Sequence, residues 1–203
     1  MPLQARSTGG SKTEQPPVGT HMARLVGLVD MGHQPPYEYN GKEVESKYKC
    51  LFIYELVNTE MEDGRPFWVD ENVNVSDYEP KKPGQVSSTM MKRVRTLDGH
   101  DGDSKNGQDL TGLIGKACMV EVKHNDKGYA MVAGVSGVPT GLPVAELRNN
   151  PVTFNMDEED VETFLRFPEF RQEQIKRALD FEGSAIHGAL LRAGHEASSN
   201  PDV

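Results

Sequence analysis

Aromatic and basic side chains recur in the strand-like segments of this chain, and together they could hold a polyanion that carries flat rings. Aromatic rings stack on nucleobases, and lysine or arginine neutralises phosphate, so the pair of residue types suits sequence-tolerant recognition of single strands. The aromatic candidates are Tyr48, Tyr54, Trp68 and Tyr129, and the basic candidates are Arg24, Lys47, Lys49, Lys92, Arg93 and Lys123.

Each candidate also has a simpler structural interpretation. An aromatic side chain that points into a small barrel is part of its core, which is an alternative for Tyr48 and Tyr54. Trp68 stands on the polar face of its strand, in alternation with Asp70 and Asn72, and this position favours contact with a ligand. Lys47 and Lys49 project to the same side of one strand, as a phosphate track requires, but solvated surface lysines would show the same spacing.

The net charge of −9 counts against simple nucleic-acid binding. The acidic excess is densest in the C-terminal third, and phosphate binding requires a local basic groove instead of a basic protein. The acidic run Asp157, Glu158, Glu159 and Asp160 has two interpretations. It can complement the positive end of a helix dipole, or it can be a docking surface that recruits replication proteins or mimics DNA.

No catalytic signature is present, and no enzyme activity is expected. The chain has no phosphate-binding P-loop, no dinucleotide-binding glycine motif after a strand and no nucleophile elbow. Its six histidines show no metal-ligand spacing, so we expect neither a cofactor nor a metal site. Cys50 and Cys118 both fall inside strand-like segments and are interpreted as reduced core thiols.

The hydrophobic pattern predicts a mainly β fold. Strand-like segments of about ten residues, rich in β-branched and aromatic residues, are bounded by Gly, Pro, Asn or Asp. A helix is predicted over 84–97, where apolar residues recur at helical spacing, between the third and fourth segments. We therefore expect a five-stranded oligonucleotide-binding (OB)-like barrel with a helix between strands 3 and 4, its strands lying at 19–30, 47–56, 66–76, 115–124 and 128–138.

The chain divides into a disordered arm (1–16), the barrel (17–139), a linker with C-terminal helices (140–192) and a disordered tail (193–203). Asn155 is expected to cap the first C-terminal helix. Pro168 is expected in the first turn of the second helix, with Phe170, Ile175 and Leu179 at core spacing.

The stretch from Gly19 to about Phe181 resembles the single-stranded-DNA-binding proteins encoded by tailed bacteriophages. The resemblance rests on an ordered series of segments: 19–32, Lys47 to Leu56 ending in Tyr-Glu-Leu, Asp63-Gly-Arg-Pro, Val73 to Ser76, Leu113 to His124, the strand of Tyr129, and Phe164 to Ile175.

This resemblance implies an OB barrel, an accessory role in phage DNA replication or recombination, and no catalysis. The expected partners are single-stranded DNA, phage or host replication proteins and further copies of the chain. The expected location is the host cytoplasm, because the sequence shows no signal peptide and no membrane segment. The alternative is a protein-interaction or DNA-mimicking factor on the same barrel without DNA affinity.

Overall fold

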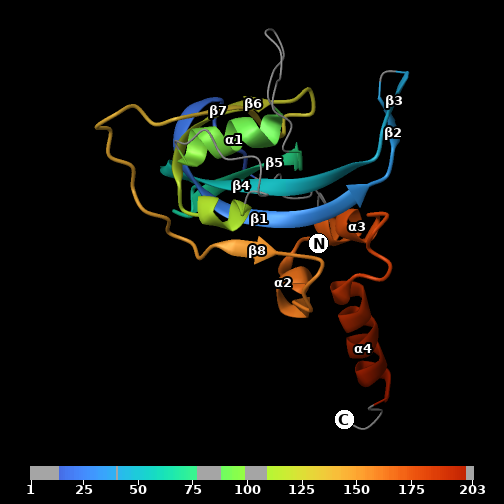
Figure 1. Ribbon diagram of the computed structural model, residues 1–203. Helices are drawn as coiled ribbons and strands as arrows, with labels where there is room; N and C mark the ends of the chain where they lie inside the picture. Colours follow the sequence, from blue (N-terminus) through green and yellow to red (C-terminus); the bar gives the residue numbers. More distant parts are fainter. Residues whose placement is uncertain (1–13, 40, 77–87, 99–108, 200–203) are drawn as a thin grey trace, which may run out of the picture.

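The computed structural model describes residues 14–39, 41–76, 88–98 and 109–199, and most of the arm expected over 1–16 lies outside this part. The strands are β1 (Gly19–Gln34), β2 (Tyr37–Tyr39), β3 (Lys42–Val44), β4 (Lys47–Glu60), β5 (Pro66–Asn74), β6 (Ala117–His124), β7 (Ala130–Ser136) and β8 (Val152–Phe154). The helices are α1 (Thr89–Asp98), the 3-10 turn η2 (Leu110–Leu113), α2 (Val161–Arg166), α3 (Glu169–Lys176) and α4 (Ala185–Ser199) (Figure 1).

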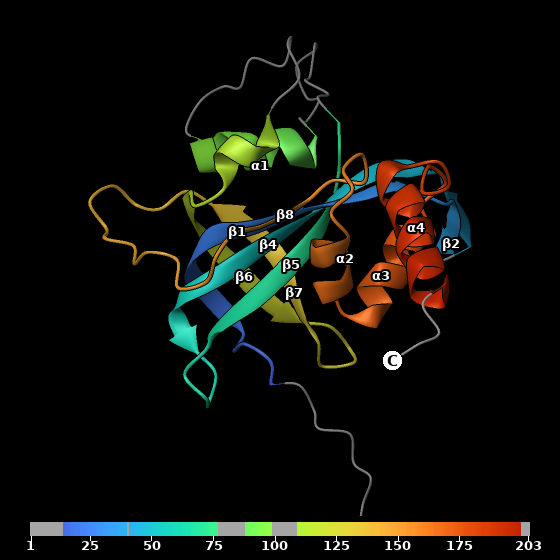
Figure 2. The same ribbon diagram turned by 90° about the horizontal axis from the view of Figure 1, so that it is seen from below.

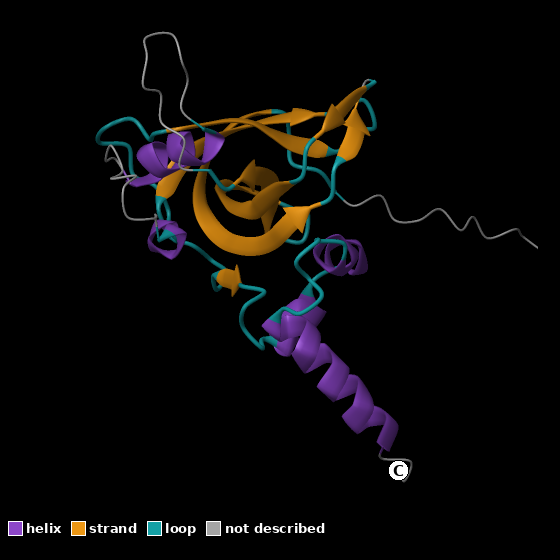
Figure 3. Cartoon of the chain, turned by 45° about the vertical axis from the view of Figure 1, so that its right-hand side comes forward, coloured by secondary structure: helices purple, strands orange, loops and turns teal. Residues whose placement is uncertain are grey.

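The chain is mainly β, as predicted. The principal sheet has the strand order β5-β4-β1-β6-β7, with antiparallel neighbours, and β8 adds to β1 in parallel. Figure 3 shows the strands following a strongly curved path. The curvature brings the two end strands, β5 and β7, near each other. We call the line along which they approach the seam.

The second predicted strand, β4, is apolar on both faces because each face of the sheet is covered. Phe52 and Tyr54 point inward and join the inner cluster, which the curved sheet surrounds. Leu51 and Ile53 point outward and join a second, outer cluster with residues of the C-terminal helices. A strand covered on both faces loses the polar alternation that marks a half-exposed strand.

Helix α1 lies at one end of the curved sheet (Figure 2) and supplies Met90, Met91, Val94 and Leu97 to the inner cluster. It overlaps the later part of the helix expected over 84–97, whose residues 84–87 lie outside the described ranges.

The C-terminal helices pack on the outer face of the sheet and differ in detail from the prediction. Asp160, not Asn155, caps α2, and its side chain accepts a hydrogen bond from the Thr163 amide. Ile175 of α3 is buried as expected, but Phe170 of α3 and Leu179, which follows the helix, are exposed. The buried face of this segment is formed instead by Arg171 and Ile175, one helical turn apart on α3, and by Ala178 just after the helix.

Two glycines of β1 allow other elements to approach closely. Gly27 lies at a register shift in the β1–β4 ladder, and a Cβ there would lie 3.1 Å from the Val152 carbonyl oxygen of β8. Gly32 has a φ of +64°, and a Cβ there would overlap Met156 and lie 2.5 Å from Asp180 Oδ1. These contacts hold the C-terminal segment against β1.

Two elements extend away from the sheet. The β2–β3 hairpin occupies the connection between the first two predicted strands, and it projects from the ends of β1 and β4 (Figure 1). Helix α4 also projects and reaches Ser199, well into the tail expected to be disordered. None of the helices described here is long and apolar enough to cross a membrane.

Candidate nucleic-acid interface

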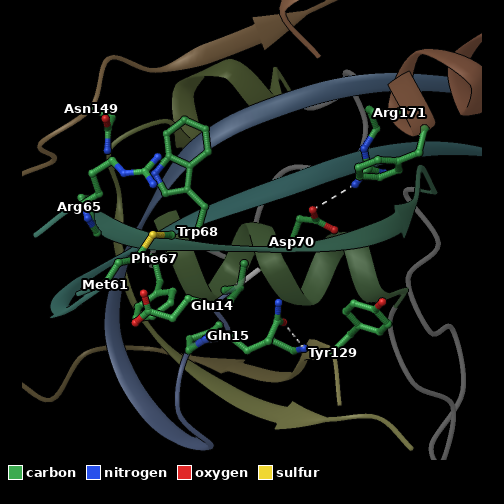
Figure 4. A pocket seen from close by; sticks show the side chains of 15 residues that line it. Glu14, Gln15, Met61, Arg65, Phe67, Trp68, Asp70, Tyr129, Asn149 and Arg171 are labelled. Atoms are coloured by element: carbon green, nitrogen blue, oxygen red, sulfur yellow. Dashed lines mark hydrogen bonds and ion pairs between the residues drawn. The ribbon is translucent and has the colours of Figure 1, made fainter. Parts of the chain in front are cut away.

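An open groove runs along the seam. We call it the seam groove; its volume is about 750 Å³, and its walls include Trp68 of β5, Tyr129 beside β7 and Phe170 of α3. Figure 4 shows these walls with Trp68 and Asp70 on β5, Tyr129 across the groove and Arg171 approaching from the helices. The seam groove thus combines side chains from three distant parts of the chain.

The groove carries three exposed aromatic rings. Trp68 is 39 % exposed, and Tyr129 and Phe170 are each 59 % exposed. The backbone of Tyr129 is fixed by the β6–β7 turn, where its amide donates to Asn125 Oδ1 and its carbonyl accepts from the Asn125 amide. Large aromatic rings that remain accessible in a groove are suited to stacking on flat ligands.

A buried carboxylate fixes the Trp68 ring. Glu55 lies directly across from Trp68 in the β4–β5 ladder and is 0 % exposed. Its carboxylate accepts hydrogen bonds from Trp68 Nε1 (3.1 Å), Asn149 Nδ2 (2.6 Å) and the Arg148 amide (2.7 Å). Glu55 therefore sets the orientation of the indole and joins it to the segment before β8.

Residues 14–17 close one end of the seam. The Gln15 side chain accepts from the Ala130 amide of β7, and Glu14 accepts from the Glu62 amide in the β4–β5 turn. His124 and His21 bond the carbonyl oxygens of Pro16 and Pro17, each at 2.8 Å. These bonds tie both sides of the seam to one short segment.

A second cavity, of about 540 Å³, lies between the sheet and α2–α3; we call it the helix-side cavity. Trp68, Asp70, Phe170 and Arg171 line both it and the seam groove. Arg171 is largely buried, and its Nη2 donates to Asp70 Oδ2 at 3.0 Å while its Nη1 donates to Gln174 Oε1 at 2.8 Å. The Asp70–Arg171 pair therefore stands at the boundary between the two spaces.

Each space also has an exposed arginine at its wall. Arg65 lines the seam groove and pairs with Asp63 at 2.7 Å, and Arg166 lines the helix-side cavity and pairs with Glu162. All four side chains of these pairs are more than half exposed. Exposed pairs of this kind contribute only about 0–1 kcal/mol, so phosphate can replace the carboxylate as partner.

Two of the predicted contact residues are largely buried instead of lying at the surface. Tyr54 is 0 % exposed, and its hydroxyl donates to Glu71 Oε1 at 2.8 Å. Arg93 of α1 makes a two-bond pair with the same carboxylate, at 2.6 and 2.9 Å. Burial, together with the neighbouring Glu71 charge, raises the pKa of Tyr54. Tyr54 and Arg93 therefore stabilise the interior instead of facing a ligand.

Arg24, a third predicted phosphate contact, is also engaged within the chain. Its guanidinium donates to the carbonyl oxygens of Gly115, Val144 and Ala145 and pairs with Glu146. It fastens the predicted linker to β1 and has little donor capacity left for phosphate.

Lys47, Tyr48 and Lys49 lie together at the hairpin end of β4, away from the seam groove. Tyr48 is half-buried and packs edge-on against His33, and burial and Asp30 raise its pKa. The Lys49 ammonium lies 5.3 Å from the centre of the Tyr37 ring. Lys49 also stands opposite Asn74, so the outward face of β5 connects this patch with Trp68.

The remaining basic candidates lie away from the seam groove and from the patch of Lys47, Tyr48 and Lys49. Lys92 is exposed on α1, and Lys123 on β6 pairs with Glu121 at 2.9 Å. Neither lines the seam groove.

The acidic run has local roles in the structure. Asp160 caps α2, and Glu159 pairs with Arg192 of α4 at 2.7 Å. The side chains of Asp157 and Glu158 are exposed.

Sequence reasoning missed Phe170, Arg171, Arg65 and Arg166 as site residues. The i, i+4 spacing of Arg171 and Ile175 is the signal from which the outward direction of Phe170 could have been predicted.

Across the described ranges, no group of three or more His, Cys, Asp or Glu side chains is arranged to hold a metal ion. Comparison of the chain with protein-family models, with curated proteins and with solved structures gave no match.

Proposed function

We propose that this protein binds single-stranded DNA along the seam groove, with little sequence preference. The observation that carries the proposal is the set of three exposed rings, Trp68, Tyr129 and Phe170, in one open groove. Stacking of bases on such rings tolerates any sequence, because every base has a π face. Arg65 and Arg166 flank the rings and are free to exchange their exposed partners for phosphate.

The curved sheet serves as an OB-like barrel whose seam is completed by residues 14–17. The chain itself acts as a single-stranded-DNA-binding protein of a tailed phage, the family that its sequence resembles. As such a protein, the chain protects displaced single strands during replication or recombination in the host cytoplasm. Phage or host replication proteins then dock elsewhere, and the exposed Asp157 and Glu158 are available for this.

The test is fluorescence anisotropy of a labelled oligo-dT, titrated at low and at moderate salt with a duplex as comparison. We expect submicromolar binding to the single strand that weakens with salt. Two phosphate contacts predict a slope of about −1.4 in log affinity against log salt, because each contributes about −0.7 on single strands.

The Trp68→Ala variant should lose about fivefold to 150-fold in affinity, the equivalent of about 1–3 kcal/mol for one stacked base. Tyr37→Ala is the matched control, because Tyr37 is an exposed aromatic residue on the β2–β3 hairpin, away from the groove. A loss in the Tyr37 variant alone would place the interface at the hairpin and refute the seam groove as the site.

A second candidate is a protein-interaction or DNA-mimicking factor. The observation that favours it is the internal pairing of Arg24, Arg93 and Lys123 with carboxylates in a chain of net charge −9. This candidate predicts no oligonucleotide binding even at low salt, and capture of a replication protein instead.

A further inference from the structure

We infer that the boundary between the seam groove and the helix-side cavity is a slot for one nucleobase, and that Asp70 selects bases carrying an amino group. The inference rests on the proposed function, since it names what one part of the same interface recognises. Trp68, Asp70, Phe170 and Arg171 form the slot because they line both cavities.

The walls of the slot are apolar and aromatic. Trp68 is held by Glu55, and Phe170 presents an exposed ring from α3. Behind them the helix-side cavity continues over Leu51, Ile53 and Phe167. A flat, weakly polar group can enter such a space with its faces against the rings and its edge toward whatever polar group lies at the boundary.

The polar group at the boundary is the Asp70 carboxylate. Trp68 and Asp70 are two residues apart on the outward face of β5, so their side chains stand side by side. Arg171 engages Oδ2 at 3.0 Å, and no other hydrogen bond or ion pair to this carboxylate is found within the described ranges. The Asp70 side chain remains 44 % exposed, which leaves Oδ1 available as an acceptor.

An ionised carboxylate only accepts hydrogen bonds. It therefore favours base edges that offer an amino group, as cytosine does through N4, over edges that offer a carbonyl oxygen at the same place, as uracil does. Arg171 holds the carboxylate in place through the hydrogen bond to Oδ2. The slot thus adds a mild base preference to a binding surface that is otherwise indifferent to sequence.

The test compares oligo-dC with oligo-dU of about 15 nucleotides, within the span of about 4–16 nucleotides that one OB fold covers. Both lack the thymine methyl, so they differ only in the polar edge. The full chain should bind oligo-dC about threefold to tenfold more tightly, the effect of one added hydrogen bond. In Asp70→Asn, the new amide oxygen can keep accepting from Arg171 while its NH₂ group faces the slot, so the preference should shrink or reverse.

Asp126→Asn is the control, since it makes the same charge change in the exposed β6–β7 turn and should keep the oligo-dC preference. Equal binding of oligo-dC and oligo-dU by the wild-type chain, or an unchanged preference in a folded Asp70→Asn variant, overturns the slot and leaves DNA binding intact. If neither oligonucleotide binds at low salt, the proposed function itself falls. Should the variant fail to fold, the wild-type preference alone decides.

Discussion

Replacement of Gly32 by alanine tests how the C-terminal helices are held on the sheet. Gly32 has a φ of +64°, a conformation that costs an L-residue about 1–2 kcal/mol. The added methyl group would also overlap Met156 and come within 2.8 Å of Ala178 Cβ. Overpacking of this kind costs about 1–3 kcal/mol more. Gly32→Ala should therefore lower the free energy of unfolding by about 2–5 kcal/mol.

The matched control is Gly128→Ala in the β6–β7 turn. Gly128 has a φ of +80°, and an added Cβ would meet nothing within 4 Å, so only the conformational cost applies. Urea denaturation followed by circular dichroism gives both values, and the difference of about 1–3 kcal/mol measures the close approach at Gly32. Each kcal/mol corresponds to a melting-temperature change of about 2–4 °C at this chain length. Equal losses in the two variants would show that the C-terminal segment does not pack against Gly32.

Three further substitutions or treatments test other parts of the structure. Arg93→Ala removes the two-bond partner of the mostly buried Glu71 carboxylate and should destabilise the chain by about 3–5 kcal/mol in urea denaturation. Oligonucleotide affinity should be unchanged while the variant is folded, and a loss of affinity would contradict the structural role of Arg93. Hydrogen bonds from the Thr163 hydroxyl and amide lower the pKa of Asp160 below its usual 3.8, so the stabilisation by this cap is present above that pH and is lost as pH falls through the lowered pKa. Asp160→Ala should therefore lower the free energy of unfolding by about 0.5–2 kcal/mol near neutral pH and by less in acid. A loss that does not depend on pH would refute the capping role. Burial raises the pKa of both cysteine thiols to about 12, so a thiol reagent at mildly alkaline pH should label the chain rapidly only in denaturant, and fast labelling of the native protein would contradict their burial.

The sequence predicted the parts of the fold that leave a local pattern. On β5, Trp68 and Asp70 alternate with buried Val69, because one face of the strand is solvated. The boundary between the predicted strands 115–124 and 128–138 is a hairpin turn, and Gly128 there has a φ of +80°, which favours glycine. Such features depend on neighbours a few residues away, and the residues themselves encode them.

Features that depend on distant partners left no such signal. The outward face of β4 is buried by helices more than a hundred residues later, so the direction of Tyr54 was undecided before the structure was known. Arg24 resembled a phosphate ligand until Glu146, 122 positions away, and the carbonyl oxygens beside it took up its guanidinium. Phe170 resembled a core residue because the helix register was assigned from the apolar residues Phe170, Ile175 and Leu179. The buried face is defined by Arg171 and Ile175 instead.

The most direct test of DNA binding at the seam groove uses the protein's own fluorescence. Trp68 is the single tryptophan of the chain, and it lies in the groove wall. Titration with an unlabelled oligo-dT at low salt should quench its emission with a submicromolar midpoint, because a base stacked on the indole changes its environment, and added salt should reverse the quenching. Unchanged Trp68 emission across the titration, with or without binding detected by other means, would contradict the assignment of the seam groove as the DNA site.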